Sequence, residues 1–559
     1  MNRHLEYKIK LLNLGMDRTI ASQCENEDSP LYGAGISPLR TYYGGESGAG
    51  LAREFLLGYY APGSKHYRDE MLLERCGRAL DFASRMQKSD GTFDLLETNF
   101  HDGAQTSFIV TLLAPAVLLM RAKSAHTPKE DALYRKLLTF LDHCADGMVN
   151  GGFHTPNHRW VMASALSMCY SLLSRKDCLD KLNKLLGEGI DQDEDGEFTE
   201  RSSGTYSIIC DRAFIILGEV MGMKEMPGIA AKNLRMILKF VEPDLTINTM
   251  NSTRQDAGTM PDWRIYYGLY LFMALRTGDP VFRFVADAML DQSASRLSEA
   301  GIEAGVGLAP YFEYLPFALM DENLQKDWDA ADTERPVMDY TKLFTHSGIL
   351  RHRRGPFSLT LVKNNPNFAL LKYGRHDVFL RLCGTFYAQG QFVAEEMNFD
   401  GDTAYLTYRR RWGYKGPLPE RQETSDWHKM DHSKRPDVMM QDFVFRVSVK
   451  ILESGAEIHV LTEGVESVLT KFEVIAEAGQ SYVTDGVFLR TKKGDYVIQS
   501  APEAEYRCDD GATLFIRGGI RKHTHAENMR GSVPADGGRF TVAMTADTPM
   551  DSTFTLEFK

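Results

Sequence analysis

The sequence predicts a multidomain protein with a helical N-terminal half and a C-terminal antiparallel β-sandwich. Its 559 residues exceed what one ordinary hydrophobic core organises, so more than one domain is expected. From about residue 50 to 300, apolar residues recur at the spacing of helices. From about residue 345, short segments rich in β-branched and aromatic residues alternate with period two, as strands do.

The helical half reads as a succession of amphipathic and buried helices. Several segments, such as TSFIVTLLAPAVLLMRA and VMASALSMCYSLLSR, are apolar on nearly every face, as helices in a protein interior are. Short turns alternate with longer loops rich in Gly, Asn, His and Thr. This alternation favours helix pairs that stack and close into an (α/α) toroid, which we assign to residues 1–325.

The second half predicts a large sandwich over residues 346–559. Its strands, among them FSLTLVKN, DFVFRVSVKILE and STFTLEF, are separated by Gly, Asn and Asp turns. The polar, acidic stretch MDENLQKDWDAADTERP at 320–336 is typical of a connection between domains. We therefore expect a linker at about 326–345.

Composition excludes several classes of function. The net charge of −12 gives no basic surface for nucleic acid, although a local Arg or His cluster can still bind an anionic substrate. The first residues contain no secretory signal, and we find no uncharged apolar run long enough to span a membrane. The eight cysteines form no CxxC pair and are expected to be reduced, as in a cytoplasmic protein.

Four polar loops precede apolar helices and supply the candidate site residues. A helix N-terminus is a natural binding place for a carboxylate, although Ser, Thr, Asn and Asp there can also be simple caps. Trp160 offers either a flat face for a sugar ring or a core anchor. The loops are 98–106 with Asn99, His101 and Asp102; 150–160 with His154, Asn157, His158, Arg159 and Trp160; 199–206 with Glu200, Arg201 and Tyr206; and 248–256 with Asn251, Arg254 and Asp256.

These residue types suit β-elimination from a uronic acid. The C5 proton of a uronate is weakly acidic because it lies next to the carboxylate. Its removal requires that the carboxylate charge be neutralised, which amides, imidazolium and guanidinium groups can do. A base must then take the proton and an acid must protonate the departing glycosidic oxygen, and Tyr and His serve both roles.

The pair Asn157-His158, followed 48 residues after His158 by Tyr206, resembles a motif of polysaccharide lyases of the heparinase II/III-like and alginate lyase type. The resemblance implies a helical toroid with a β-sandwich and a carbon–oxygen lyase activity. It also implies that Asn157 and His158 neutralise the uronate, that Tyr206 is an acid or base, and that His346 is the further partner, with His376 as a second candidate.

One departure from that pattern weakens the assignment of the sandwich histidine. The Gly-His-x-His-x-Asp strand of heparinase-type sandwiches is absent, and GRHDV at 374–378 keeps only part of it. The resemblance therefore gives no firm support for a zinc ion in the sandwich. We expect a metal-independent, cytoplasmic enzyme whose partner is an anionic oligosaccharide or polysaccharide, with no required cofactor. The substrate-binding residues would be Asn99, His101, His154, Arg159, Trp160, Glu200, Arg201, Arg254 and Asp256.

Two other functions remain open at this point. A glycoside hydrolase on the same toroid needs two carboxylates beside the scissile bond, which Glu200 with Asp102 or Asp256 would supply. A carbohydrate-binding protein without catalysis would use the same cleft.

An acidic loop just before Tyr206 predicts either a calcium site or a solvated turn. Asp191, Asp193, Asp195 and Gly196 match the D-x-D-x-D-G opening of an EF-hand loop. The twelfth position is Ser202, where a bidentate glutamate is needed. A full EF-hand is therefore excluded, and a looser structural Ca²⁺ site bound by the three aspartates is the alternative to a plain turn.

Overall fold

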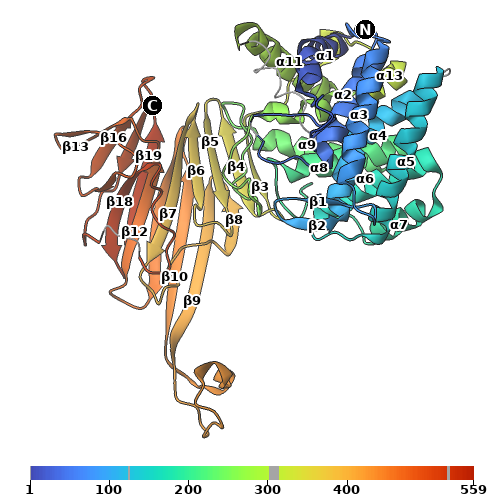
Figure 1. The fold of residues 1–559 in the computed structure, drawn as a ribbon. Coiled ribbons are helices and arrows are strands. Elements are labelled where there is room, and N and C mark those ends of the chain that lie inside the picture. Colours follow the sequence, from blue (N-terminus) through green and yellow to red (C-terminus); the bar gives the residue numbers. More distant parts are fainter. Residues whose placement is uncertain (1, 39, 124–125, 301–313, 526–528) are drawn as a thin grey trace. The chain divides into compact units, whose positions relative to one another are not determined.

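The computed structural model describes residues 2–38, 40–123, 126–300, 314–525 and 529–559. They divide into two compact units, here called the helical unit (1–238 and 247–336) and the sheet unit (239–246 and 337–559). Helices precede a large antiparallel β-structure, so the predicted fold class is confirmed (Figure 1). The predicted linker at 326–345 contains the boundary after residue 336, and the first strand of the sheet unit already begins inside it, at Tyr340.

The helical unit carries the helices that the periodicity predicted between residues 50 and 300. The N-terminal helix α1 and a small hairpin of β1 (Phe93–Leu95) and β2 (Asn99–Asp102) were not predicted. The helices are α1 (Arg3–Ser22), α2 (Gly45–Tyr60), α3 (Glu70–Met86), α4 (Gly103–Arg121), α5 (Pro128–Asn150), α6 (Pro156–Leu173), α7 (Lys176–Gly187), α8 (Tyr206–Met221), α9 (Met226–Ile237), α10 (Tyr267–Thr277), α11 (Pro280–Ala300) and α13 (Leu315–Met320).

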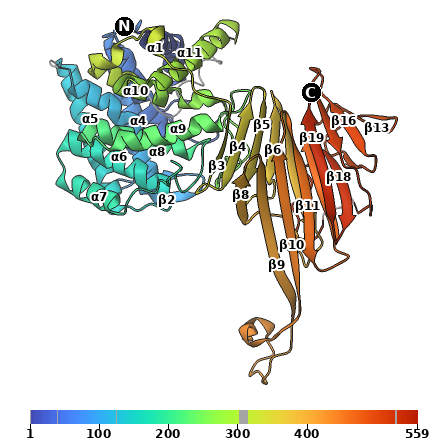
Figure 2. The same cartoon turned by 180° about the vertical axis from the view of Figure 1, so that it is seen from behind.

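The order of packing explains why one end of this unit collects polar loops. Consecutive helices pack as pairs, α2 with α3, α4 with α5, α6 with α7 and α8 with α9, while α2, α4, α6 and α8 also contact one another in that order (Figures 1 and 2). Short connections make the members of a pair antiparallel, so α4, α6 and α8 all point the same way. The loops that precede them therefore lie at the same end.

Helix α4 is the most apolar element of the unit. By length and composition alone its residues 103–121 would be able to cross a membrane, so the expectation that the chain holds no such run was wrong. In the structure 83% of this window is buried. Burial on all sides is also seen in α6 and α8, and it accounts for their lack of a polar face.

The sheet unit consists of two large sheets. All pairings between neighbouring strands are antiparallel except that of β15 with β18. One sheet has the order β14-β13-β16-β17-β19-β11-β10-β9-β8 and the other β15-β18-β12-β7-β6-β5-β4-β3. The strands are β3 (Tyr340–Phe344), β4 (Ile349–Arg354), β5 (Phe357–Val362), β6 (Ala369–Tyr373), β7 (His376–Gly384), β8 (Glu396–Asp400), β9 (Thr403–Lys415), β10 (Asp437–Ile451), β11 (Gly455–Gly464), β12 (Leu469–Ala476), β13 (Ser481–Thr484), β14 (Val487–Arg490), β15 (Tyr496–Ile498), β16 (Glu503–Arg507), β17 (Thr513–Arg517), β18 (Phe540–Asp547) and β19 (Asp551–Phe558).

Alternating side chains of both sheets form one apolar core. In β10, for example, Phe443, Phe445, Val447 and Val449 are buried while the residues between them are more exposed. The distal halves of β9 and β10 leave the body of the unit and carry the loop 416–436 at their end, as both ribbon views show (Figures 1 and 2).

A short strip of chain from the middle of the helical region belongs to the sheet unit. Residues 239–246 hold a glutamate, Glu242, whose carboxylate receives Arg351 Nη1 at 2.7 Å and Ser358 Oγ at 2.5 Å. Arg353 Nη1 donates to the carbonyl of Val241 at 2.9 Å. Both Glu242 and Arg351 are fully buried, so this ion pair is sealed within the sheet unit.

Candidate functional site

Three of the four polar loops identified in the sequence are bound together in the helical unit. The backbone N–H of Asn157, at the start of α6, donates to the carboxylate of Glu200 at 2.9 Å. The backbone N–H and Oγ1 of Thr253 donate to the carbonyl of Glu200 at 3.2 and 2.9 Å. The loop before α8 is therefore held between the loop before α6 and the loop at 248–256.

The carboxylate of Glu200 occupies the N-terminus of α6. Besides the backbone bond, Asn157 Nδ2 donates to its two oxygens at 2.8 and 3.0 Å. A helix N-terminus does bind a carboxylate here, as the sequence indicated, but the carboxylate is the protein's own. Asn157 is fully buried and its amide donors are committed to Glu200 and Thr155. The prediction that Asn157 contacts a uronate is therefore wrong for this structure, in which Asn157 positions Glu200.

Arg254 and Tyr206 lie side by side at the start of α8. The guanidinium Nε of Arg254 is 3.4 Å from Glu200 Oε1, and its guanidinium carbon is 5.1 Å from the centre of the Tyr206 ring. The Tyr206 hydroxyl donates to Gln255 Oε1 at 3.3 Å. The Arg254 side chain is 30% exposed, so a positive charge and a phenol hydroxyl are available together to a bound anion.

His158 adds an imidazole to this group. Its ring meets the ring of His154 edge-on at 4.7 Å and that of Phe108 at 5.9 Å. Burial, and then the charge of His154, lower the pKa of His158 to about 4, while the charge of Asp102 acts in the opposite direction. The imidazole is therefore neutral at pH 7, which is the protonation state that a general base needs. The predicted imidazolium that would neutralise a uronate is not the form that the free protein presents.

Further contacts fix the loop at 196–206 from its other side. Asn251 Nδ2 donates to both carboxylate oxygens of Glu197, at 2.8 and 3.0 Å. The backbone N–H of Gly204 donates to Asp256 Oδ2 at 2.9 Å, and a Cβ at position 204 would lie only 2.8 Å from that oxygen. The close approach explains why a glycine stands at position 204. Asp256 thus holds the loop rather than facing a substrate.

The remaining loop lines a shallow hollow of about 460 Å³ beside His158. Its walls are residues 98–103 and 152–154, with Asn99, His101 and His154 among them. Asp102 Oδ1 caps α4 by accepting from the N–H of Ala104 at 2.7 Å, and its other oxygen accepts from Asn99 Nδ2 at 2.9 Å. His154, on the wall of the hollow, contacts the ring of His158.

Two residues of these loops have left-handed backbone conformations that residues other than glycine rarely adopt. The φ angles are 50° at His101 and 51° at Arg201. Such strain costs about 1–3 kcal/mol per residue, and it is concentrated at functional sites in proteins generally. Both residues are in the loops that the sequence had singled out.

Comparison with known proteins agrees with this architecture. The sequence matches no protein-family model and no curated protein. Among solved structures, Paenibacillus xanthan lyase is similar with a TM-score of 0.56 and 8% identity over 99% of this chain, which spans 57% of that enzyme's length. Streptomyces coelicolor A3 chondroitin AC lyase in complex with chondroitin sulphate has a TM-score of 0.53 and 12% identity, with 98% of this chain and 79% of that chain covered.

The chain has the fold of the toroid-and-sandwich polysaccharide lyases. This fold was the one that the predicted order of a helical toroid and a β-sandwich implied. At 8% and 12% identity the likeness concerns the fold alone.

Within this lyase fold, two predicted substrate-binding residues are structural. Trp160 is fully buried and packs on Phe214 with ring centres 4.7 Å apart, so the expectation that it offers a face to a sugar ring is wrong. Arg159 is also buried, lies over the Trp160 ring at 4.2 Å and pairs with Glu188 at 3.0 Å. Both side chains are buried between α6 and the elements packed around it, because α6 is covered on nearly every face.

Hydrogen bonds from Trp160 and from within the loop hold the acidic loop in place. Asp191 Oδ1 accepts from Trp160 Nε1 at 2.6 Å, and Asp193 Oδ1 accepts from the N–H of Glu197 at 2.9 Å. In the part of the chain that the structure describes, Asp191, Asp193 and Asp195 are not among the groups of three or more ligand atoms close enough to share a metal ion. The geometry favours a braced turn, and the Ca²⁺ site stays a prediction.

The two predicted histidines of the second half are in the sheet unit. His346 lies in the turn between β3 and β4 of the sheet unit. His376 is buried at the start of β7, where Nε2 is 2.8 Å from Asp510 Oδ2. His376 is therefore part of the sandwich interior, and His346 keeps its predicted role as the further partner.

Sequence reasoning missed several residues of the site. Gln255, which accepts from the Tyr206 hydroxyl, directly follows Arg254 in a loop that had been identified, so its position was the only available signal. Phe108 on α4 and Arg212 on α8 lie inside helices, where no loop motif marks them. Arg212 lies over the Phe108 ring at 6.0 Å and donates to Thr111 Oγ1 at 3.2 Å, and burial lowers its pKa to about 10.

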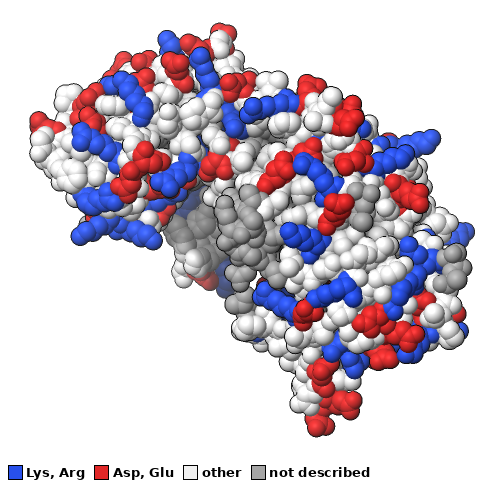
Figure 3. Space-filling view, turned by 90° about the horizontal axis from the view of Figure 1, so that it is seen from above, with Lys and Arg blue, Asp and Glu red and all other residues white. Residues whose placement is uncertain are grey.

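The face drawn in Figure 3 shows no broad positively charged field that would attract an anion. On the face drawn in Figure 3, Lys and Arg are interspersed with Asp and Glu. With a net charge of −12, attraction of an anionic substrate has to come from local groups such as Arg254.

Proposed function

We propose that this protein is a lyase that cleaves uronate-containing oligosaccharides or polysaccharides by β-elimination. The observation that carries the proposal is the group of Tyr206, Arg254 and His158 at one end of the helical unit. It combines a phenol hydroxyl, a partly exposed guanidinium and a neutral imidazole. The lyase fold supports the same reaction class, since the similar structures are a xanthan lyase and a chondroitin AC lyase.

In the proposed complex the uronate carboxylate binds beside Arg254. As the C5 proton leaves, negative charge builds up on that carboxylate and on C5. A guanidinium already fixed by Glu200 stabilises this charge without reorganising during the reaction. Glu200 and Asn157 thus act by positioning Arg254 and the start of α6, and not by touching the substrate.

The proton transfers use the two remaining groups. A neutral His158 or the oxygen of Tyr206 accepts the C5 proton, and the electron pair of the C–H bond forms the C4–C5 double bond. The bond between C4 and the glycosidic oxygen breaks, and that oxygen takes a proton from the Tyr206 hydroxyl or another acid. The products are a 4,5-unsaturated uronate and a sugar with a free hydroxyl. The role of His346 as a further partner stays a prediction of the family resemblance.

The state of the carboxylates favours the lyase over the hydrolase. A glycoside hydrolase needs two carboxyl groups that face the scissile bond. Glu200 is bound by Asn157 and Arg254, Asp256 by Gly204, and Asp102 caps α4. All three carboxylates are therefore engaged in holding loops or helix ends.

The proposal is tested by mixing the purified protein with a panel of uronate glycans that includes xanthan and chondroitin sulphate fragments. Turnover is followed by the ultraviolet absorbance of the unsaturated uronate. Tyr206→Phe should lower kcat by about 10²- to 10⁴-fold, because it removes one acid–base group. Tyr170→Phe, a half-buried residue on α6 of the same unit, is the matched control and should retain turnover.

New reducing ends without any rise in absorbance would identify a hydrolase. Binding of a glycan with no product of either kind would identify a carbohydrate-binding protein. Either result overturns the lyase proposal, as would a Tyr206→Phe variant that turns over as fast as the unmodified protein.

A further inference from the structure

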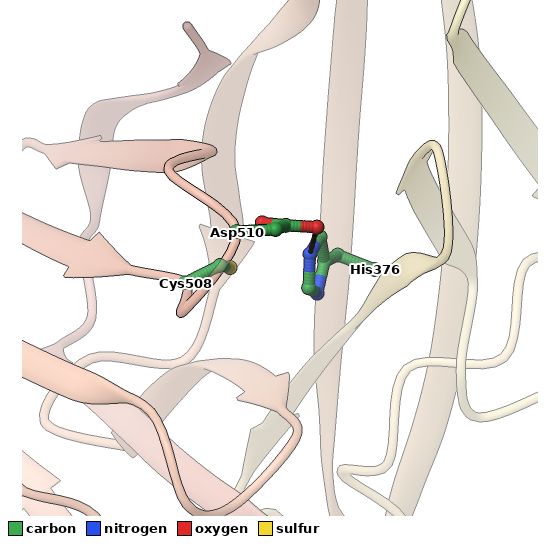
Figure 4. A group of neighbouring side chains, drawn as sticks. All are labelled: His376, Cys508 and Asp510. Atoms are coloured by element: carbon green, nitrogen blue, oxygen red, sulfur yellow. Dashed lines mark hydrogen bonds and ion pairs between the residues drawn. The ribbon is translucent and has the colours of Figure 1, made fainter.

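The sheet unit contains a second group of chemically active side chains, remote in sequence from one another. His376 begins β7 in the eight-stranded sheet, whereas Cys508 and Asp510 lie in the turn between β16 and β17 of the nine-stranded sheet. One ligand atom from each residue lies within 4.8 Å of the others. Figure 4 shows the three side chains directed toward one another. Nothing in the sequence spacing indicates this group, because 132 residues separate His376 from Cys508.

The three groups are the donor types that zinc prefers. Zinc in proteins is bound by thiolate, imidazole and carboxylate, with bonds of about 2.0–2.3 Å in a tetrahedral arrangement. Ligand atoms of such a site lie roughly 3.3–3.7 Å apart, by the geometry of those bonds. The distance of 2.8 Å from His376 Nε2 to Asp510 Oδ2 and the limit of 4.8 Å for the group bracket these values. Movements of about 1 Å at the side chains would therefore complete the site.

The surroundings of His376 also match a metal ligand. Its other ring nitrogen, Nδ1, is buried, makes no hydrogen bond among the described residues, and lies 3.6 Å from Glu477 Oε2. A histidine that binds zinc through one nitrogen usually presents the other N–H to a carboxylate, which fixes the tautomer. Glu477 is placed to do this, and it would leave Nε2 free for the metal.

The cysteine is a free thiol at the edge of the apolar core of the sandwich. Cys508 is buried, forms no disulfide, and its sulfur takes part in no hydrogen bond within the described residues. Its turn is well defined, with the N–H of Cys508 donating to the carbonyl of Ala512 at 2.8 Å and Ala512 N–H donating to Asp510 Oδ1 at 3.3 Å. The turn thus holds the thiol and the carboxylate on the same side, toward β7.

We propose that His376, Cys508 and Asp510 bind a zinc ion that joins the two sheets of the sandwich, with Glu477 as the outer partner of the histidine. Asp510 is 42% exposed at its side chain, so water reaches the site and supplies the fourth ligand. Arg375, whose Nε is 3.4 Å from Asp510 Oδ2, would turn away or stay as an outer contact. The zinc ion would have a structural role, because it would connect the start of β7 in one sheet to the β16–β17 turn of the other.

The test uses the full-length protein without a histidine tag, after removal of metals with a chelator and dialysis. Titration with Zn²⁺ should show one equivalent bound, and Co²⁺ should give the sulfur-to-metal charge-transfer absorption of a thiolate ligand. Cys508→Ser should abolish that absorption. Glu477→Gln should weaken zinc binding about 10- to 100-fold, as loss of an outer partner does, and Asp510→Asn should weaken it by more.

A control and a second readout keep the outcomes decisive. Cys24→Ser, a half-exposed cysteine of the helical unit, should bind Zn²⁺ and Co²⁺ like the unmodified protein. At a hundredfold excess of zinc over its dissociation constant, the sheet unit should unfold roughly 5–10 °C higher. Absence of stoichiometric zinc, or a charge-transfer band that survives Cys508→Ser, would overturn the proposal. Because glycan turnover is not part of this test, its failure leaves the lyase proposal unaffected.

Discussion

Two buried glutamates, Glu200 in the helical unit and Glu242 in the sheet unit, show how the same kind of contact serves different ends. Each accepts hydrogen bonds and pairs with an arginine, Arg254 in one case and Arg351 in the other. Arg351 is fully enclosed, whereas Arg254 keeps 30% of its side chain exposed beside Tyr206. The enclosed pair can have only a structural role, because no ligand reaches it. The partly exposed pair holds a positive charge where a ligand can reach it.

The largest effect should come from breaking the enclosed pair. Arg351→Met leaves Glu242 as an uncompensated buried charge, and we expect a loss of about 3–5 kcal/mol in the free energy of unfolding. Chemical denaturation measures it. Arg446→Met, which removes an exposed pair with Glu463 at 2.6 Å, is the control and should destabilise the protein far less, because solvent screens exposed pairs. Equal losses in the two variants would contradict the distinction between enclosed and open pairs.

Breaking the open pair should affect turnover more than folding. Arg254→Gln removes the charge proposed to stabilise the uronate, so kcat/KM should fall about 10²- to 10³-fold. The free energy of unfolding should change by only about 1 kcal/mol or less, because the pair with Glu200 is partly exposed. Steady-state kinetics and denaturation on the same preparation measure both quantities. A variant that loses stability but not turnover would show that Arg254 is structural.

Glu200→Gln tests the same pair by removing the charge of the carboxylate in place of that of the arginine. The variant keeps the size of the side chain but loses the charge that binds Asn157 and Arg254. We expect the unfolding free energy to fall by about 1–3 kcal/mol and turnover to decrease only in part. If Glu200→Gln abolishes turnover while Tyr206→Phe and His158→Ala leave it intact, the hydrolase is the correct function.

The smallest expected effect is a shift in pH dependence at His158. Burial lowers its pKa in the folded protein to about 4, below its usual value near 6.5. Between these values the unfolded chain binds more protons, so the free energy of unfolding should fall as the pH decreases from about 6.5 toward 4. His158→Gln should flatten this part of the stability profile. The acidic limb of kcat/KM should likewise lie near pH 4, and a limb near pH 6.5 would contradict the assignment of His158 as a neutral base.

The predicted site residues that the structure brings close together are those whose sequence signal is local. Helical periodicity and the loops before buried helices predicted where Tyr206, His158 and Arg254 would meet, because parallel inner helices bring their N-terminal loops to one end. The role of Asn157 was misjudged since it depends on Glu200, 43 residues away. Similarly, the choice between a sugar-binding face and a core anchor for Trp160 stayed open, because a sequence does not show which side of an all-apolar helix is covered.

Long-range contacts also explain the unpredicted features of the sheet unit. The group of His376, Cys508 and Asp510 forms only when two sheets pack face to face, so no spacing rule could identify it. The strip 239–246 reads locally as the end of a helix and a turn. Its assignment to the sheet unit follows only from its partners on β4 and β5, which lie more than 100 residues later.

The strip at 239–246 has a consequence for the modularity of the chain. The polypeptide passes from one unit to the other after residues 238, 246 and 336, and not once as in a simple tandem of domains. A fragment that begins at Val337 would lack Glu242 and would leave Arg351 buried without its carboxylate. A fragment that ends at Pro336 would carry that glutamate without its arginine. Gene fusion or truncation at the apparent linker would therefore separate Arg351 from the carboxylate that compensates its charge.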